Sequence, residues 1–248
     1  RWWGLEAIAP LVRETAGFVN LRSAWRGADR FVNLLRLFEL LAANAAARAG
    51  AALPDLTSLR AYCRQEAPRS NATLAEAAAR TGDPELARVL AWSRAVDADI
   101  ATRMAPVPPF AWARRGLERL AADCDLVVVS QTPEAALARE WRQHGLAGLP
   151  ARICGQERGS KRRQLEWAAA GRYPPGRVLM IGDAPGDLEA AEACGALFYP
   201  VMPGAEEDSW RRLHEEACDR FLAGRYAGDY AGTLKAEFRR ALPAREGT

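Results

Sequence analysis

The sequence predicts an α/β protein with two domains, an all-helical domain at residues 1–105 and a parallel-sheet domain at residues 106–248. Two observations carry this prediction. Up to about Met104, apolar residues recur at helical spacing, and no run has the composition of a strand. Beyond a proline-rich segment at 105–110, short apolar runs alternate with amphipathic stretches, which is the pattern of parallel βαβ units.

Composition narrows the class of protein. With 49% hydrophobic and 26% charged residues among 248, the chain resembles ordinary globular proteins and can hold two domains. The net charge of +3 is small and comes from scattered arginines, since lysine occurs only as Lys161 and Lys235. We therefore expect no nucleic-acid partner. No apolar run is long enough to cross a bilayer, so we expect no membrane partner either.

The cysteine pattern indicates the cellular compartment in which we expect the protein. All five are scattered without a CxxC pair, and the two histidines show no zinc-ligand spacing. Scattered thiols and no signal peptide favour the reducing cytoplasm, where the thiols pack as small apolar groups. The chain begins with arginine and not methionine, so we expect the native N-terminus to lie upstream of Arg1.

Helices in the first domain follow from apolar spacing and from proline start signals. Pro54 and Pro84 each precede or open a helical pattern, and the turn at 81–84 separates two of the helices. The expected helices cover residues 31–41, 55–66, 73–80 and 84–103. Three prolines in the segment 105–110 cannot continue a helix, so this segment predicts the domain boundary.

Strands and helices alternate in the second domain. The expected strands are the apolar runs at 126–129, 152–154, 178–181 and 196–199. The expected helices cover residues 111–122, 133–144, 161–170, 188–193, 206–222 and 230–241. Strands joined by helices in this way form a parallel sheet, whose sites lie at the carboxyl ends of the strands.

Two carboxylates follow one of these strands directly. The strand at 178–181 is apolar throughout, as in a strand buried on both faces, and it stops at Gly182. Asp183 and Asp187 then lie on a turn that contains Pro185 and Gly186. Hard oxygen ligands at this place suit Mg²⁺. The alternative is a helix whose first turn is capped by aspartate, without any chemistry.

Reactive residue types also follow two other strands. Ser130 ends the strand at 126–129, where a hydroxyl and the free N–H groups of the next helix would form an anion site. Lys161 opens a helix, an unfavourable place for a cation unless an anion or a carboxylate lies nearby. Each residue also has a plain explanation, because Ser130 can cap the helix after Pro133 and Lys161 can be a solvated lysine.

Taken together, these residues resemble the motifs of the haloacid-dehalogenase-like (HAD) hydrolase superfamily. The apolar strand ending in Ser130 matches its second motif, Lys161 matches the third, and the sequence Gly182-Asp183-Ala-Pro-Gly-Asp187 matches the fourth. The resemblance covers about residues 106–200 and is specific as a set. It implies a Rossmann-like parallel sheet, with the helices at 1–105 as an inserted cap domain.

The resemblance also implies roles for the matching residues. Ser130, with the backbone N–H of Gln131, would bind the transferring phosphoryl group, and Lys161 would neutralise its charge. Asp183 would bind Mg²⁺, and Asp187 would be a second ligand or hold a metal-bound water. The implied activity is a Mg²⁺-dependent phosphatase that hydrolyses a small phosphorylated metabolite through an aspartyl-phosphate intermediate. Positioning and neutralising charge are what such a transition state requires.

The nucleophile motif of the family, DxDx[TV] after a first strand, is missing. Asp97 and Asp99 have the DxD spacing, but they lie in a helical pattern without a preceding apolar strand, so we reject them. We expect the first strand and its aspartates upstream of Arg1, and we expect residues 1–248 alone to be inactive. Residues 1–105 would then lie between the first and second motifs, where many members of the family insert a helical cap.

Several alternatives stay open. A phosphomutase or a dehalogenase of the same family would have similar motifs, and a chain truly lacking the nucleophile would be a non-catalytic binding or regulatory protein. A dinucleotide or P-loop domain is disfavoured because neither GxGxxG nor GxxxxGK[ST] occurs. In the cap, the residues at 25–27 and 29–31 would contact an anionic or ring-bearing substrate, or simply pack. The sequence leaves the substrate and the oligomeric state open.

Overall fold

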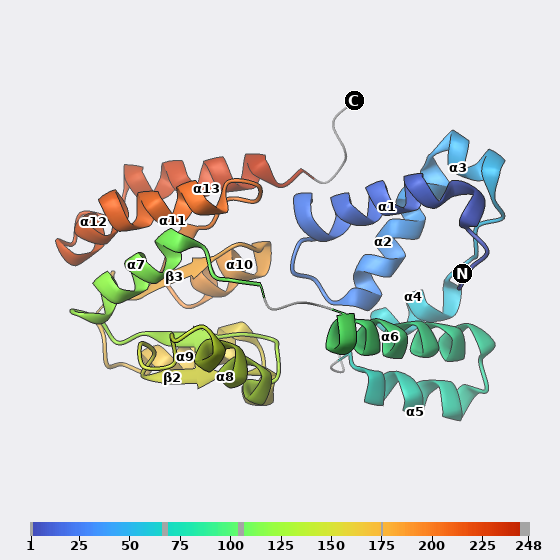
Figure 1. The fold of residues 1–248 in the computed structure, drawn as a ribbon, viewed down its shortest axis with the longest axis horizontal. Coiled ribbons are helices and arrows are strands. Elements are labelled where there is room, and N and C mark those ends of the chain that lie inside the picture. Colours follow the sequence, from blue (N-terminus) through green and yellow to red (C-terminus); the bar gives the residue numbers. More distant parts are fainter. Residues whose placement is uncertain (1, 66–68, 104–106, 175, 244–248) are drawn as a thin grey trace. The chain divides into compact units, whose positions relative to one another are not determined.

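The computed structural model describes residues 2–65, 69–103, 107–174 and 176–243. The chain divides into two compact units between residues 106 and 107 (Figure 1). The predicted boundary between residues 105 and 106 lies outside the described residues, as does residue 66, the predicted end of the second helix.

The described residues of the first unit contain helices and no strands, as predicted. The helical elements are η1 (Glu6–Ile8), α1 (Ala9–Gly17), the π-helix η2 (Phe18–Arg22), α2 (Arg30–Ala43), α3 (Ala45–Gly50), α4 (Thr57–Cys63), α5 (Asn71–Thr81) and α6 (Pro84–Arg103). Asp29 caps α2 by accepting the N–H groups of Phe31 and Val32, and Ser70 and Thr73 form a capping box at α5. With these caps, α2 begins one residue before its predicted start, and α5 begins two residues before its predicted start.

An apolar core of its own stabilises the first unit. The apolar face of α2 supplies much of it, with Phe31, Leu34 and Leu41 almost fully buried. Leu59 of α4 and Val89 of α6 pack into the same cluster. Helices that each carry one apolar stripe bury it by packing on one another, so this unit needs no sheet.

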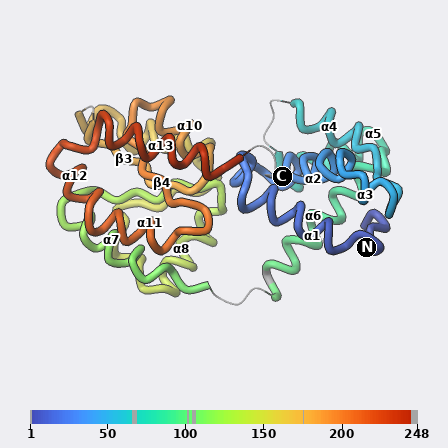
Figure 2. Tube along the Cα trace, turned by 90° about the horizontal axis from the view of Figure 1, so that it is seen from above, coloured from blue at the N-terminus to red at the C-terminus, as the bar shows by residue number. Residues whose placement is uncertain are grey.

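The second unit alternates helices with short parallel strands, as predicted. Its strands are β1 (Val127–Val129), β2 (Arg152–Cys154), β3 (Leu179–Gly182) and β4 (Leu197–Pro200). The helical elements are α7 (Ala111–Ala121), α8 (Glu134–Gln143), η3 (Gln156–Arg158), α9 (Lys161–Ala169), α10 (Pro185–Ala193), α11 (Glu206–Arg212), the π-helix η4 (Leu213–Ala217), α12 (Cys218–Leu222) and α13 (Asp229–Ala241). The tube in Figure 2 shows the helices α10, α11 and α13 around the strands β3 and β4.

The strands form two separate sheets and not the single sheet that the sequence predicts. β1 pairs with β2 in parallel, with Val128 opposite Ile153, and β3 pairs with β4 in parallel, with Met180 opposite Phe198. Among the described residues no strand joins the two pairs. The α/β class and the parallel direction are therefore confirmed, and the continuous sheet is not formed by these residues.

Two further differences from the predicted elements have local causes. The helix expected at 188–193 begins at Pro185, because a proline at the first helical position needs no N–H partner. The helix expected at 206–222 contains a π-helical turn at Leu213–Ala217, which separates α11 from α12.

Two apolar clusters hold the second unit together. One surrounds Tyr199, Leu213 and Tyr226, and the other surrounds Met180, Phe198 and Phe238. Val129 of β1 packs against the second cluster, so both sheets contribute to it. No helix in the described part of the chain combines the length and the apolar character needed to cross a bilayer.

Candidate functional site

Ser130 and Gln131 follow β1 directly, at its carboxyl end. The hydroxyl oxygen of Ser130 accepts the N–H of Thr132 at 3.1 Å, a local turn that fixes the loop. The side chain of Gln131 donates to the carbonyl of Gly159 at 2.9 Å. Within the described residues the backbone N–H of Gln131 has no hydrogen-bond acceptor. This N–H and the hydroxyl proton of Ser130 are donors that an anion at the strand end can use.

The start of α8 is less open to an anion than the sequence predicts. The carboxylate of Glu157, in η3, accepts the backbone N–H of Glu134 at 3.1 and 3.2 Å. It therefore occupies the first turn of this helix in place of a ligand. A Cβ on Gly155 would approach the nitrogen of Glu134 to 2.3 Å, so glycine is needed for this close packing. The anion site predicted at the end of β1 is thus limited to the donors of Ser130 and Gln131.

Lys161, the first residue of α9, forms an ion pair with Asp187, one of the two aspartates that follow β3. Its Nζ donates to Oδ1 of Asp187 at 2.5 Å. Asp187 is only 4% exposed in its side chain and Lys161 is 26% exposed, so the pair is shielded on the aspartate side and open on the lysine side. The carboxylate explains why a cation is tolerated at this helix start, and it brings α9 and α10 together.

Asp187 also organises the turn after β3. Its Oδ2 accepts the N–H groups of Asp183 and Ala184 at 3.1 and 3.0 Å, so the carboxylate closes the first turn of α10. Asp187 packs so tightly on Gly182 that a Cβ there would lie 2.4 Å from that of Asp187. This fixes Asp183, which is half-buried, at the carboxyl end of β3.

Gln164 is a member of this site that the sequence analysis missed. Its side chain is 1% exposed and lies one helical turn after Lys161 on α9. Oε1 accepts the N–H of Ser130 at 2.9 Å, and Nε2 lies 3.0 Å from the carbonyls of Ser130 and Gly155 and 2.9 Å from that of Gly159. Its spacing of three residues from Lys161 is the one signal in the sequence, and a glutamine at that spacing is too common to be noticed.

The backbone of β1 and of β3 is paired along one edge only. Ser130 N–H donates to Cys154 and the carbonyl of Leu126 accepts from Ala151, so in β1 the groups of Val128 also face β2. The groups of the alternate residues, Val127 and Val129, face the other edge. The same alternation in β3, where the carbonyls of 178 and 182 accept from β4, leaves the groups of Leu179 and Ile181 on its other edge. No described strand pairs with either of these edges.

The carboxylates offer a partial set of metal ligands. Among the described residues no group of three or more His, Cys, Asp or Glu side chains could hold a metal ion. Mg²⁺ commonly binds one or two protein carboxylates and completes its shell with water and phosphate oxygens. Asp183 and Asp187 fit that smaller requirement, although the Asp187 oxygens already bind Lys161 and the backbone. The metal-binding role of both residues stays a prediction.

The thiols are not suited to nucleophilic catalysis. Burial raises the pKa of Cys63 and of Cys218 to about 11. Burial also raises the pKa of Cys124, Cys154 and Cys194 above the ordinary thiol value. Because only the thiolate is a strong nucleophile, these side chains are poorly reactive at neutral pH, in agreement with the packing role expected for them.

The residues at 25–31, expected either to bind substrate or to pack, have partners within the first unit. Trp25 packs edge-on against Phe18, with ring centroids 6.5 Å apart, and Phe31 is 3% exposed. Asp29 caps α2, and Arg30 donates to an aspartate of α6 at 2.6 Å. These contacts favour the packing interpretation.

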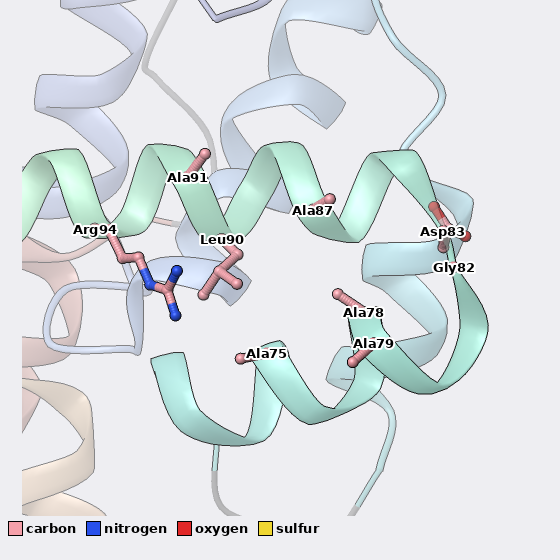
Figure 3. Close-up of a pocket in the computed structure, with 9 residues that line it drawn as sticks. All are labelled: Ala75, Ala78, Ala79, Gly82, Asp83, Ala87, Leu90, Ala91 and Arg94. Atoms are coloured by element: carbon pink, nitrogen blue, oxygen red, sulfur yellow. The ribbon is translucent and has the colours of Figure 1, made fainter.

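A separate hollow of about 390 Å³ lies between α5 and α6 of the first unit (Figure 3). Alanines of both helices form its walls, and Leu90 lies at its floor. Asp83 at one end is engaged in capping α6, and the exposed Arg94 lies at the other end. The hollow is therefore lined mainly by small apolar side chains, with one charged residue at each end.

Comparison of the chain with protein-family models, with curated protein sequences and with solved structures gives no match.

Proposed function

We propose that this protein is a Mg²⁺-dependent phosphatase of the HAD type that hydrolyses a small phosphorylated metabolite. One observation carries the proposal: residues that follow β1, β2 and β3 belong to one network of hydrogen bonds. Gln164 joins the ends of β1 and β2, and Lys161 joins that group to Asp187 after β3. A hydroxyl, a lysine and two carboxylates in one place match the requirements of phosphoryl transfer.

The unpaired edges of β1 and β3 support the proposal that a further strand pairs with both of them. Runs such as Val127–Val129 are typical of central strands, buried on both faces and paired on both edges. In the described residues β1 and β3 are each paired once. A parallel strand that pairs with both would unite the two sheets, and its carboxyl end would lie beside Ser130 and Asp183. We propose that this strand precedes Arg1 and carries the nucleophilic aspartate.

In the proposed reaction, each residue acts through a group that the structure describes. The Ser130 hydroxyl and the Gln131 N–H hold the phosphoryl oxygens, and the Lys161 ammonium neutralises charge as it accumulates in the transition state. Asp183, with Asp187 beside it, would hold Mg²⁺, which supplies further charge neutralisation when bound. Asp187 positions Lys161 through their ion pair. The five free cysteines fit a cytoplasmic location.

The test starts from the sequence encoded upstream of Arg1 and from the protein that includes it. That sequence should contain an apolar run followed by DxD, and the protein should release inorganic phosphate from some member of a phosphorylated-metabolite panel with Mg²⁺ but not with EDTA. Asp183→Ala should abolish this release, while Asp123→Ala, at an exposed turn aspartate, should retain it. Full activity of Asp183→Ala would overturn the metal assignment.

Each alternative has its own outcome. Halide release without phosphate release would identify a dehalogenase, and isomerisation of a sugar phosphate without net hydrolysis would identify a phosphomutase. An upstream sequence without DxD, in a protein that binds phosphate but never turns it over, would identify a non-catalytic binding protein.

A further inference from the structure

Gln164 is a polar side chain in the interior of the second unit, where polar side chains are uncommon. It is 1% exposed, and a buried amide without partners would destabilise the fold. Here both ends of the amide have partners, and all of them are backbone groups of the loops after β1 and β2. The hydrogen bonds that satisfy the glutamine therefore also fix those two loops relative to each other.

These two loops carry the proposed phosphate contacts. Gln164 binds both the N–H and the carbonyl of Ser130, so the peptide groups on either side of this residue are clamped. It also binds the carbonyl of Gly159, two residues before Lys161, and it shares the helix α9 with that lysine. The Gln131 side chain reaches the same Gly159 carbonyl. The buried amide of Gln164 thus connects the backbone of Ser130 to the helix that begins with Lys161.

We propose that Gln164 is a positioning residue that holds Ser130 and Lys161 at the spacing required to bind a phosphate oxyanion. This proposal rests on the proposed function, because it assumes that these two residues bind phosphate. Both polar atoms of the Gln164 amide already have backbone partners and the residue is buried, so it acts through the loops that it joins. An error of a fraction of an ångström in that spacing weakens every contact to the oxyanion.

The experiment uses the chain's unusual lysine content. Because Lys161 and Lys235 are the only lysines among residues 1–248, a sample of this chain labelled with ¹³C at lysine Cε gives two side-chain resonances. Inorganic phosphate, titrated at fixed pH with Mg²⁺ in excess, should shift the Lys161 resonance in a saturable way. Lys235, paired with Glu192 on α10, serves as the internal reference.

The decisive variant is Gln164→Met, which keeps the length of the side chain and removes its hydrogen bonds. It should need about tenfold more phosphate for half-saturation, the effect of losing one good hydrogen bond. Gln143→Met, at an exposed glutamine near the end of α8, should titrate like the wild type. Thermal unfolding of each variant sets a temperature at which all are folded, so that a loss of stability alone cannot mimic weaker binding.

The outcomes separate the two proposals. If the wild type shows a phosphate-dependent shift and folded Gln164→Met titrates within twofold of it, the positioning role is wrong and the phosphate site stands. If the wild type shows no shift, the phosphate site itself is wrong, and the positioning role fails with it. Should Gln164→Met not fold, Gln164→Glu keeps the acceptor for Ser130 and loses the amide donors, and the same twofold criterion applies to it.

Discussion

At the residue scale, the candidate site depends on the ion pair between Lys161 and Asp187 and on the hydrogen bonds of the Gln164 amide. The motif residues Ser130, Lys161, Asp183 and Asp187 could be named because reactive types follow apolar strands, and the structure joins Lys161 to Asp187 directly. Gln164 could not be named, because its partners are backbone groups of the loops after β1 and β2. A pattern records which residues are present, whereas satisfaction of buried polar groups is decided by the fold.

Gly182 offers a test of this residue-scale packing. A methyl group at this position would lie within 2.5 Å of the Asp187 carboxylate, so Gly182→Ala must displace either that side chain or β3. We expect it to lower the free energy of unfolding by about 1–3 kcal/mol and to weaken the Lys161–Asp187 contact. Urea unfolding measures the first effect, and the Lys161 ¹³Cε resonance reports the second.

Gly186→Ala is the matched control for that substitution. Gly186 lies four residues later, in the first turn of α10, and an added Cβ would meet no atom within 4 Å. Because alanine favours a helix by up to about 1 kcal/mol over glycine, this variant should be as stable as the wild type or more so. Equal stability of the two alanine variants would show that the close contact at Gly182 does not constrain the turn.

At the scale of elements, the sequence predicted which segments are helices or strands and that the strands run in parallel. It predicted less well which strands pair with each other. Alternating apolar and amphipathic segments were sufficient to predict parallel strands joined by helices, and the strands lie within one residue of their expected positions. A single continuous sheet is not formed by the described strands and stays a prediction. Pairing between β1 and β3 would require that their free edges meet, and local patterns contain no information on which strands become neighbours.

Amide hydrogen exchange can test the free edges. In the 248-residue chain the N–H groups of Val127, Val129, Leu179 and Ile181 should exchange faster than those of Val128 and Met180, because the latter pair across β1–β2 and β3–β4. In the protein that includes the sequence upstream of Arg1, the four fast amides should become protected. Equal protection within each strand of the shorter chain would mean that both edges are already paired.

At the scale of the whole molecule, the two units differ in whether their described elements leave strand edges unpaired. The apolar cluster of the first unit is built from its own helices, and its helix starts are capped by its own side chains. In the second unit there are two sheets of two strands, and each of these strands is paired on one edge only among the described residues. An unpaired, valine-rich edge is an unfavourable arrangement that proteins normally cover. The strand that we propose would therefore pair with the second unit and not with the first.

This difference predicts how the two units behave when separated. A fragment of residues 2–103 should be helical by circular dichroism and should unfold cooperatively, because a domain that has its own core can fold alone. A fragment of residues 107–243 should have a lower midpoint in urea, and it should bind a dye specific for exposed apolar surface more strongly. Adding a peptide that contains the proposed strand should raise that midpoint, since a ligand that binds only the folded state stabilises it. A second fragment as stable as the first, and indifferent to the peptide, would argue that the two sheets are complete as they stand.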